Sequence, residues 1–266
     1  MVNSQSMSQT AISFDGVPIA FETCGQGETA ILFVHGWQGN RRWWDHQRDA
    51  FSKKYQIVQM DLAGHGESLP PRKTASVRAY AEDIRAVVEK LGLRRVVLVG
   101  HSMSGSNVVE AYNLIPTRVP MVILVDTLLD LDHLPSLEEV SPFLESMRKD
   151  FRGTIEASFA QFVFAKTSPK GVIDRIVREI GTAIPSVAIS NLEPFYSTDI
   201  REACERIKVP VRAINSDLFQ TNPSANRKYF INFEYEIISG VGHYPMLEAP
   251  TEFNKALGRI LESISA

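Results

Sequence analysis

Ser102 is the residue whose neighbours best suit a nucleophile. An apolar segment at 95–99 runs directly into Gly-His-Ser-Met-Ser-Gly at 100–105, and a segment of helical pattern follows. A serine on such a tight strand-to-helix turn projects its hydroxyl above a sheet, provided that small residues stand two positions before and after it. Gly100 and Ser104 meet that need. An ordinary turn that happens to contain serine has the same pattern, so the motif needs partners elsewhere.

His243 is the imidazole that such a serine would require. A serine hydroxyl is a weak nucleophile at neutral pH and needs a base that a third group orients. His243 lies in Gly-Val-Gly-His-Tyr-Pro at 240–245, after the last expected strand and before the last helix, where a loop can fold back over the sheet edge. That position distinguishes it from the five other histidines, which are His35, His46, His65, His101 and His133.

Two backbone N–H groups are candidates for an oxyanion hole, which stabilises negative charge on a substrate oxygen. Met103 directly follows the nucleophile, and Trp37 follows His35-Gly36 at the end of the apolar run 30–34. We expect the N–H groups of Trp37 and Met103 to fill this role, although a simple strand-ending turn would also explain His35-Gly36. The histidines lack the short spacing of a ligand pair, so no metal site is expected.

Two carboxylates compete to orient the base. Asp126 ends the apolar run 121–125, and a charged residue at the tip of a buried strand is costly unless it is paired, for example with a histidine ring. Asp217 lies in Ser-Asp-Leu-Phe at 216–219, after a later strand. We favour Asp126 and keep Asp217 as the alternative acid. Either residue could instead cap backbone N–H groups at a strand end.

Apolar runs and helical stripes alternate over much of the chain. The runs at 30–34, 96–99, 121–125, 209–214 and 235–238 are rich in Val, Ile and Leu, as expected for strands covered on both faces of a parallel sheet. Because helical segments separate the strands, we expect right-handed crossovers and a doubly wound α/β sheet.

The middle of the chain is expected to form a helical cap. From about 128 to 207 the sequence contains helical stripes and no convincing strand. We therefore expect a core of 1–127 and 208–266, with a cap of 128–207 inserted after the sixth strand and covering the carboxyl edge where parallel sheets bind ligands. Aromatic residues that could line an apolar pocket there, or simply pack in the core, are Trp37, Phe159, Phe162, Phe195 and Tyr196.

Composition narrows the class of protein. Apolar residues make up 44% and charged residues 22%, and a net charge of -3 without long runs of one sign predicts binding to neither nucleic acid nor a membrane surface. The expected partner is a small molecule, and the oligomeric state stays open. The first ten residues do not resemble a secretory signal, and Cys24 and Cys204 are too few for a disulfide framework, so we expect a cytoplasmic protein with two free thiols.

Together these motifs resemble the α/β-hydrolase superfamily. The resemblance rests on His35-Gly36, the loop 61–68, the turn at 100–104 and the segment 240–243. It implies the α/β-hydrolase fold, no cofactor, and a loop at 61–68 that shapes the site. Because the nucleophile position holds serine and not aspartate, it points away from haloalkane dehalogenases and epoxide hydrolases. It points toward esterases, lactonases, carbon–carbon bond hydrolases and related cofactor-free enzymes.

The resemblance also bears on the acid. In most of the family the acid follows the strand before the last, and that position holds Phe219 here. In the dehalogenases it ends the sixth strand, where Asp126 stands. We thus expect a serine hydrolase that cleaves a small carboxylic ester or a related acyl compound through a Ser-His-Asp triad and an acyl-enzyme. The alternatives are a cofactor-free lyase or carbon–carbon bond hydrolase, or a low-turnover ligand sensor. Specificity depends on side-chain placement in the cap, so the natural substrate is not readable.

Overall fold

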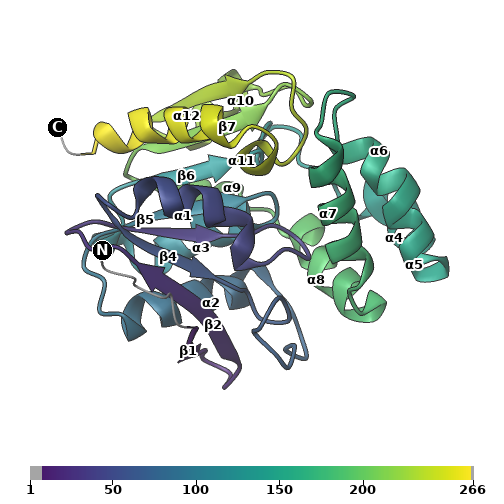
Figure 1. The fold of residues 1–266 in the computed structure, drawn as a ribbon, viewed down its shortest axis with the longest axis horizontal. Helices are drawn as coiled ribbons and strands as arrows, with labels where there is room; N and C mark the ends of the chain where they lie inside the picture. Colours follow the sequence, from purple (N-terminus) through teal and green to yellow (C-terminus); the bar gives the residue numbers. More distant parts are fainter. Residues whose placement is uncertain (1–7, 265–266) are drawn as a thin grey trace.

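The computed structural model describes residues 8–264, which form one eight-stranded sheet with its helices packed around it (Figure 1). The strand order is β1-β2-β4-β3-β5-β6-β7-β8, with antiparallel pairing of β1 with β2 and of β2 with β4, and parallel pairing elsewhere. This confirms the expected fold class. The strands are β1 (Gln9–Ile12), β2 (Pro18–Cys24), β3 (Ala30–Val34), β4 (Gln56–Met60), β5 (Val96–His101), β6 (Val122–Val125), β7 (Val211–Ser216) and β8 (Phe233–Ile238).

Helices connect the strands as crossovers. Those that accompany the sheet are α1 (Asp45–Phe51), α2 (Val77–Lys90), α3 (Ser104–Leu114), α9 (Arg201–Glu205), α10 (Pro223–Tyr229), α11 (Pro245–Glu248) and α12 (Pro250–Glu262), together with the 3₁₀ turns η1 (Arg41–Trp44) and η2 (Pro116–Arg118). The α2 helix begins at Ser76, whose side chain accepts a hydrogen bond from the N–H of Ala79. Such an N-cap satisfies a backbone donor that the first turn leaves free.

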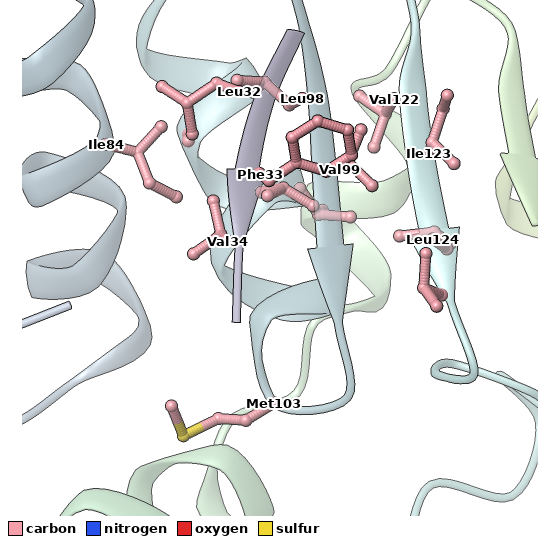
Figure 2. Packing of buried hydrophobic residues seen from close by; sticks show 14 of the residues in the cluster. Leu32, Phe33, Val34, Ile84, Leu98, Val99, Met103, Val122, Ile123 and Leu124 are labelled. Carbon is pink, nitrogen blue, oxygen red and sulfur yellow. The ribbon is translucent and has the colours of Figure 1, made fainter. Parts of the chain in front are cut away.

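The apolar core lies around the central strands. Every residue of β3 and β6 is buried, as is every residue of β5. Figure 2 shows Phe33 of β3, Val99 of β5 and Ile123 of β6, which are successive partners across the three strands, with Met103 at the turn beyond the end of β5. Full burial of a side chain of this size stabilises a fold by about 1.5–3 kcal/mol. The core therefore holds the carboxyl ends of these three strands at fixed relative positions.

A second group of helices lies beyond the sheet, at the right of Figure 1. It comprises α4 (Leu137–Lys149), α5 (Phe151–Thr154), the π-helical turn η3 (Ile155–Phe159), α6 (Ala160–Val163), α7 (Lys170–Gly181) and α8 (Pro185–Ser197). In contrast, α9 contacts α3 and α10 of the core. We therefore propose that the cap ends near Ser197, earlier than the 128–207 expected from the sequence.

Two ends of the chain lie outside the described residues, 1–7 and 265–266. The absence of a secretory signal was expected largely from the first of these segments. Within residues 8–264 no helix is both long and apolar enough to cross a membrane.

Candidate active site

Ser102 lies on the sharp turn between β5 and α3, with a backbone φ of 53°. Positive φ is strained for a residue with a side chain, so the surrounding packing must hold this turn. Gly100 permits the close approach of strand and helix, because a Cβ there would lie 2.3 Å from the carbonyl oxygen of Ser104. The Ser104 hydroxyl donates in turn to the carbonyl of His35 at 2.5 Å, which ties the turn to the end of β3.

The imidazole of His243 lies between Ser102 and Asp126. Its Nε2 is 2.8 Å from the Ser102 hydroxyl, and its Nδ1 is 2.7 Å from Oδ2 of Asp126. Ser102 is half-buried and the His243 side chain is 15% exposed, whereas the Asp126 side chain is fully buried. The hydroxyl and the imidazole can therefore meet a ligand, and the carboxylate is shielded from water.

Both oxygens of Asp126 have partners. Oδ2 meets His243, and Oδ1 accepts from the N–H of Ser216 at 2.7 Å. Burial opposes the charged carboxylate, but the hydrogen bonds from His243 and Ser216 outweigh it, so that the pKa of Asp126 lies below its ordinary value. A carboxylate held ionised in this way fixes the Nδ1–H tautomer of His243 and leaves Nε2 free to accept a proton.

Trp37 follows β3 and Met103 follows β5, so their backbone N–H groups lie beyond the carboxyl ends of two neighbouring parallel strands. Both residues are buried, and neither N–H donates a hydrogen bond to another group among residues 8–264. Gly36 brings the first of these segments against the second, because a Cβ on Gly36 would lie 3.0 Å from that of Ser102. Free donors beside a nucleophile are what an oxyanion requires.

Residues 29–167, more than half of the chain, match the family model described as the alpha/beta hydrolase fold. The chain belongs to the α/β-hydrolase fold family. The resemblance inferred from the sequence motifs is thereby confirmed.

Relatives of this α/β hydrolase carry different functional names. The Karrikin insensitive 2 receptor IA of Petunia hybrida is 25% identical over 247 residues, covering 87% of this chain and 90% of the relative. The non-heme chloroperoxidase of Streptomyces lividans is 27% identical over 237 residues, covering 82% and 84%. Among solved structures, a thermophilic esterase from Thermogutta terrifontis superposes with a TM-score of 0.85 at 22% identity, covering 98% and 100% of the two chains. At that identity the structural likeness establishes the fold alone.

The alternative acid, Asp217, does not contact His243. Its exposed side chain accepts from the N–H of Gly240 at 2.8 Å, on the loop that leads to His243. Phe219 stands two residues later, with its ring centre 6.3 Å from that of the imidazole and nearly perpendicular to it. Of the two carboxylates considered from the sequence, the fold thus brings Asp126 to His243 and leaves Asp217 bound to backbone.

Three further histidines, His35, His65 and His101, are buried. Burial lowers the pKa of His35 to about 4 and, together with neighbouring positive charge, lowers those of His65 and His101 to about 3. They are therefore neutral near pH 7. His101 donates from Nε2 to the carbonyl of His243 at 2.8 Å, and its ring packs 4.8 Å from that of His243. Sequence reasoning gave His101 no role, although it immediately precedes Ser102.

Trp37, which follows β3, contacts the cap through its aromatic side chain. The indole N–H of Trp37 donates to the carbonyl of Ala188 on α8 at 2.7 Å, and its ring lies 5.7 Å from that of Phe159. Phe162 is 66% exposed and packs 5.0 Å from Phe219. The aromatic residues expected to line one pocket are thus divided: Trp37 is buried against α8 of the cap, and Phe162 lies at the surface against Phe219.

The other two expected lining residues border a separate half-open cavity of about 210 Å³. Phe195 and Tyr196 form part of its wall, with Ser106 of α3 and Leu128, which follows β6. Among the described residues, no group of three or more His, Cys, Asp or Glu side chains is arranged to hold a metal ion. Cys24 and Cys204 are not bonded to each other.

Proposed function

We propose that this chain is a serine hydrolase that cleaves a small carboxylic ester or a related acyl compound. The observation that carries the proposal is the continuous hydrogen-bonded series Ser102–His243–Asp126, together with the N–H groups of Trp37 and Met103, which no other group engages among residues 8–264. In this proposal Ser102, His243 and Asp126 form the catalytic triad. These five groups have the roles that acyl transfer needs.

In the first half-reaction, His243 Nε2 takes the proton of Ser102 as the serine oxygen attacks the substrate carbonyl carbon. The resulting oxyanion accepts hydrogen bonds from the N–H groups of Trp37 and Met103, each worth about 3 kcal/mol of barrier. His243 then gives its proton to the departing alkoxide, which leaves as an alcohol. The acyl group stays bound to Ser102 as an ester.

In the second half-reaction, water attacks the acyl-enzyme while His243 takes its proton. The oxyanion forms again at the same donors, and its collapse releases the carboxylic acid and restores the Ser102 hydroxyl. Throughout both steps Asp126 stays ionised and stabilises the imidazolium. The sequence of proton transfers requires no cofactor.

Ser102→Ala tests the assignment most directly. We expect hydrolysis of p-nitrophenyl acetate to fall on the order of 10⁶-fold, because the nucleophile is lost and the remaining triad members act only as a unit with it. Thermal unfolding of the variant should match the parent, since only one hydroxyl is removed. A variant that keeps its turnover would exclude Ser102 as the nucleophile.

A second candidate function is supported by the relative named a karrikin receptor, which matches 87% of this chain. A ligand sensor on this fold would retain the same three residues and bind a small acyl compound with little or no repeated turnover. Pre-steady-state kinetics separates the two. Repeated release of nitrophenol favours the hydrolase, one burst per chain favours the sensor, and neither burst nor turnover favours a lyase or carbon–carbon bond hydrolase.

A further inference from the structure

Glu248, at the end of α11, binds the loop that carries His243 on both sides of that residue. Its Oε2 accepts from the N–H of Gly242 at 2.7 Å, and its Oε1 accepts from the N–H of Tyr244 at 3.0 Å. One carboxylate therefore engages the backbone immediately before and immediately after the histidine. Two such contacts restrict both the position and the direction of the intervening Cα–Cβ bond.

The Glu248 carboxylate is buried without an ion-pair partner among residues 8–264. Glu248 is 8% exposed, and no Lys, Arg or His among residues 8–264 forms an ion pair with it. A buried charge is costly unless hydrogen bonds to the charged form replace its hydration. The donors that do so here are the two loop N–H groups and one hydroxyl, so the cost of burying Glu248 is tied to the conformation of the His243 loop.

The hydroxyl belongs to the cap. Ser168, just before α7, donates to Oε2 of Glu248 at 2.5 Å. The same part of the cap makes two further contacts with this loop: the N–H of His243 donates to the carbonyl of Val163 at 2.7 Å, and the Thr167 hydroxyl donates to the carbonyl of Gly240 at 2.7 Å. Glu248 therefore joins the loop and the cap in one hydrogen-bonded unit.

We infer that Glu248 is a positioning residue, which holds the His243 imidazole in line between Ser102 and Asp126 and fixes it relative to the cap. The inference rests on the proposed function for its catalytic consequence. Glu248 touches neither Ser102 nor the reacting atoms. It acts through the backbone of Gly242 and Tyr244, and a displacement of the imidazole by about 1 Å lowers a catalytic rate on the order of a hundredfold.

The test compares Glu248→Gln with Glu252→Gln. Glutamine has the same shape as glutamate, but its amide offers one oxygen acceptor and turns an NH₂ group toward the second loop N–H. For p-nitrophenyl acetate we expect kcat to fall roughly ten- to hundredfold in Glu248→Gln, with KM changed little, since the imidazole moves and the binding surface does not. Glu252 is exposed on the first turn of α12, so its variant should retain the parent kcat.

Ser168→Ala separates the cap from the loop. It removes one of three donors and leaves the N–H groups of Gly242 and Tyr244 bonded to Glu248, so we expect a smaller loss of kcat than in Glu248→Gln. An equal loss would mean that the contact with the cap, and not the contact with the loop, governs the rate. That result would overturn the inference.

A measurement without turnover keeps this inference distinguishable from the proposed function. The Nδ1 proton of His243, shared with Asp126, should give a strongly deshielded proton NMR resonance, assigned by its loss in His243→Asn. We expect Glu248→Gln to shift or broaden this resonance, and Glu252→Gln to preserve it. An unchanged resonance in Glu248→Gln would overturn the positioning role, whatever the enzyme hydrolyses. An absence of ester turnover in the parent chain would instead reject the proposed function alone.

Discussion

At the scale of single residues, backbone strain gathers where the candidate chemistry lies. Within residues 8–264, the non-glycine residues with positive φ are Gln38, Ser102, Asp126 and Leu128. All four follow the ends of β3, β5 or β6, at the carboxyl edge of the sheet. Strain of this kind persists only where the surroundings enforce it, and it clusters at functional sites. Residue type does not reveal this strain at Gln38, Ser102 or Leu128, because among non-glycine residues it is mainly Asn and Asp that adopt positive φ, and only Asp126 belongs to that group.

The choice between the two carboxylates is a second property of this scale. Asp126 and Asp217 both follow a strand and both end up hydrogen-bonded to backbone N–H groups. Only the fold of the loops after β6 and β7 decides which one also reaches His243, and that depends on contacts far apart in the chain. The motifs in the sequence therefore pointed to Ser102 and His243, which the fold brings into contact, whereas for the acid they favoured Asp126 and kept Asp217 as the alternative.

Asp126→Asn and Asp217→Asn form a matched pair for this question. Asparagine at 126 would present an NH₂ donor or a neutral oxygen to His243, favour the wrong tautomer and lower kcat by about 10⁴-fold. At 217 the amide oxygen can still accept from Gly240, so turnover should stay within a few fold of the parent. The ratio kcat/KM for a nitrophenyl ester gives the comparison. Similar losses in both variants would contradict the assignment of Asp126.

At the scale of elements, apolar runs predicted the largely buried strands β3, β5, β6 and β7 and also β8, where Tyr235 and Ile237 are exposed, but they missed β4. Its sequence, Gln-Ile-Val-Gln-Met, is interrupted by polar residues, yet Gln59 is 2% exposed. The side chain of Gln59 is accommodated because its amide donates to the carbonyl of Arg41 at 3.0 Å and to Asp45 at 3.2 Å. A pattern of apolar residues does not reveal a buried polar residue whose hydrogen-bond partners lie elsewhere in the sequence, so it did not indicate this strand.

At the junction of β5 and α3, a methyl group added at Gly100 should destabilise the fold. In Gly100→Ala the new Cβ would approach the Ser104 carbonyl to 2.3 Å, so strand and helix must separate. We expect the free energy of unfolding to fall by about 1–3 kcal/mol and ester turnover to fall with it, because the turn that holds Ser102 moves.

Gly171→Ala is the control for that substitution. Gly171 lies on α7, and apart from the nearby backbone of that helix no atom would lie within 4 Å of a Cβ at this position. Alanine should therefore leave the free energy of unfolding unchanged or raise it by about 0.5 kcal/mol. Urea denaturation of both variants measures the difference. Equal stabilities for the two would contradict the close contact described at Gly100.

At the scale of the whole molecule, much of the polar interior is engaged in buried pairs. Arg41 pairs with Glu22, Asp61 and Glu67, and so connects η1 to β2 and to the loop after β4. Removing one partner of such a buried network leaves an uncompensated charge and is strongly destabilising. The loop 61–68, which the family resemblance describes as shaping the site, is thus held to the body of the protein through Asp61.

The buried histidines make global stability depend on pH. The unfolded chain binds protons at His35, His65 and His101 near pH 6.5, whereas the folded chain does so only near pH 4 for the first and near pH 3 for the other two. The unfolded state therefore holds more protons as the pH falls below 6.5, and stability is lost. At pH 5 each histidine should cost roughly 2 kcal/mol in the free energy of unfolding relative to pH 7.

Urea denaturation at pH 7, 6 and 5 measures that loss. His65→Gln removes one of the three titrating groups and should flatten the dependence by about a third. The exposed His46 on α1 supplies the control, since His46→Gln should leave the slope as it is in the parent. A free energy of unfolding that is constant from pH 7 to pH 5 would show that these three imidazoles titrate alike in both states.

The carboxylate beside His243 belongs to Asp126, the residue that directly follows β6. Because that carboxylate comes from β6, the loop after β7 is released from supplying it, and the loop holds Phe219 beside the imidazole instead. Under the proposed function, a substitution of Phe219 would change the surface beside the imidazole, while Asp126 would keep its contact with His243. If that function holds, selectivity at this wall and reactivity would depend on different segments, so that position 219 could be varied while Ser102, His243 and Asp126 are kept.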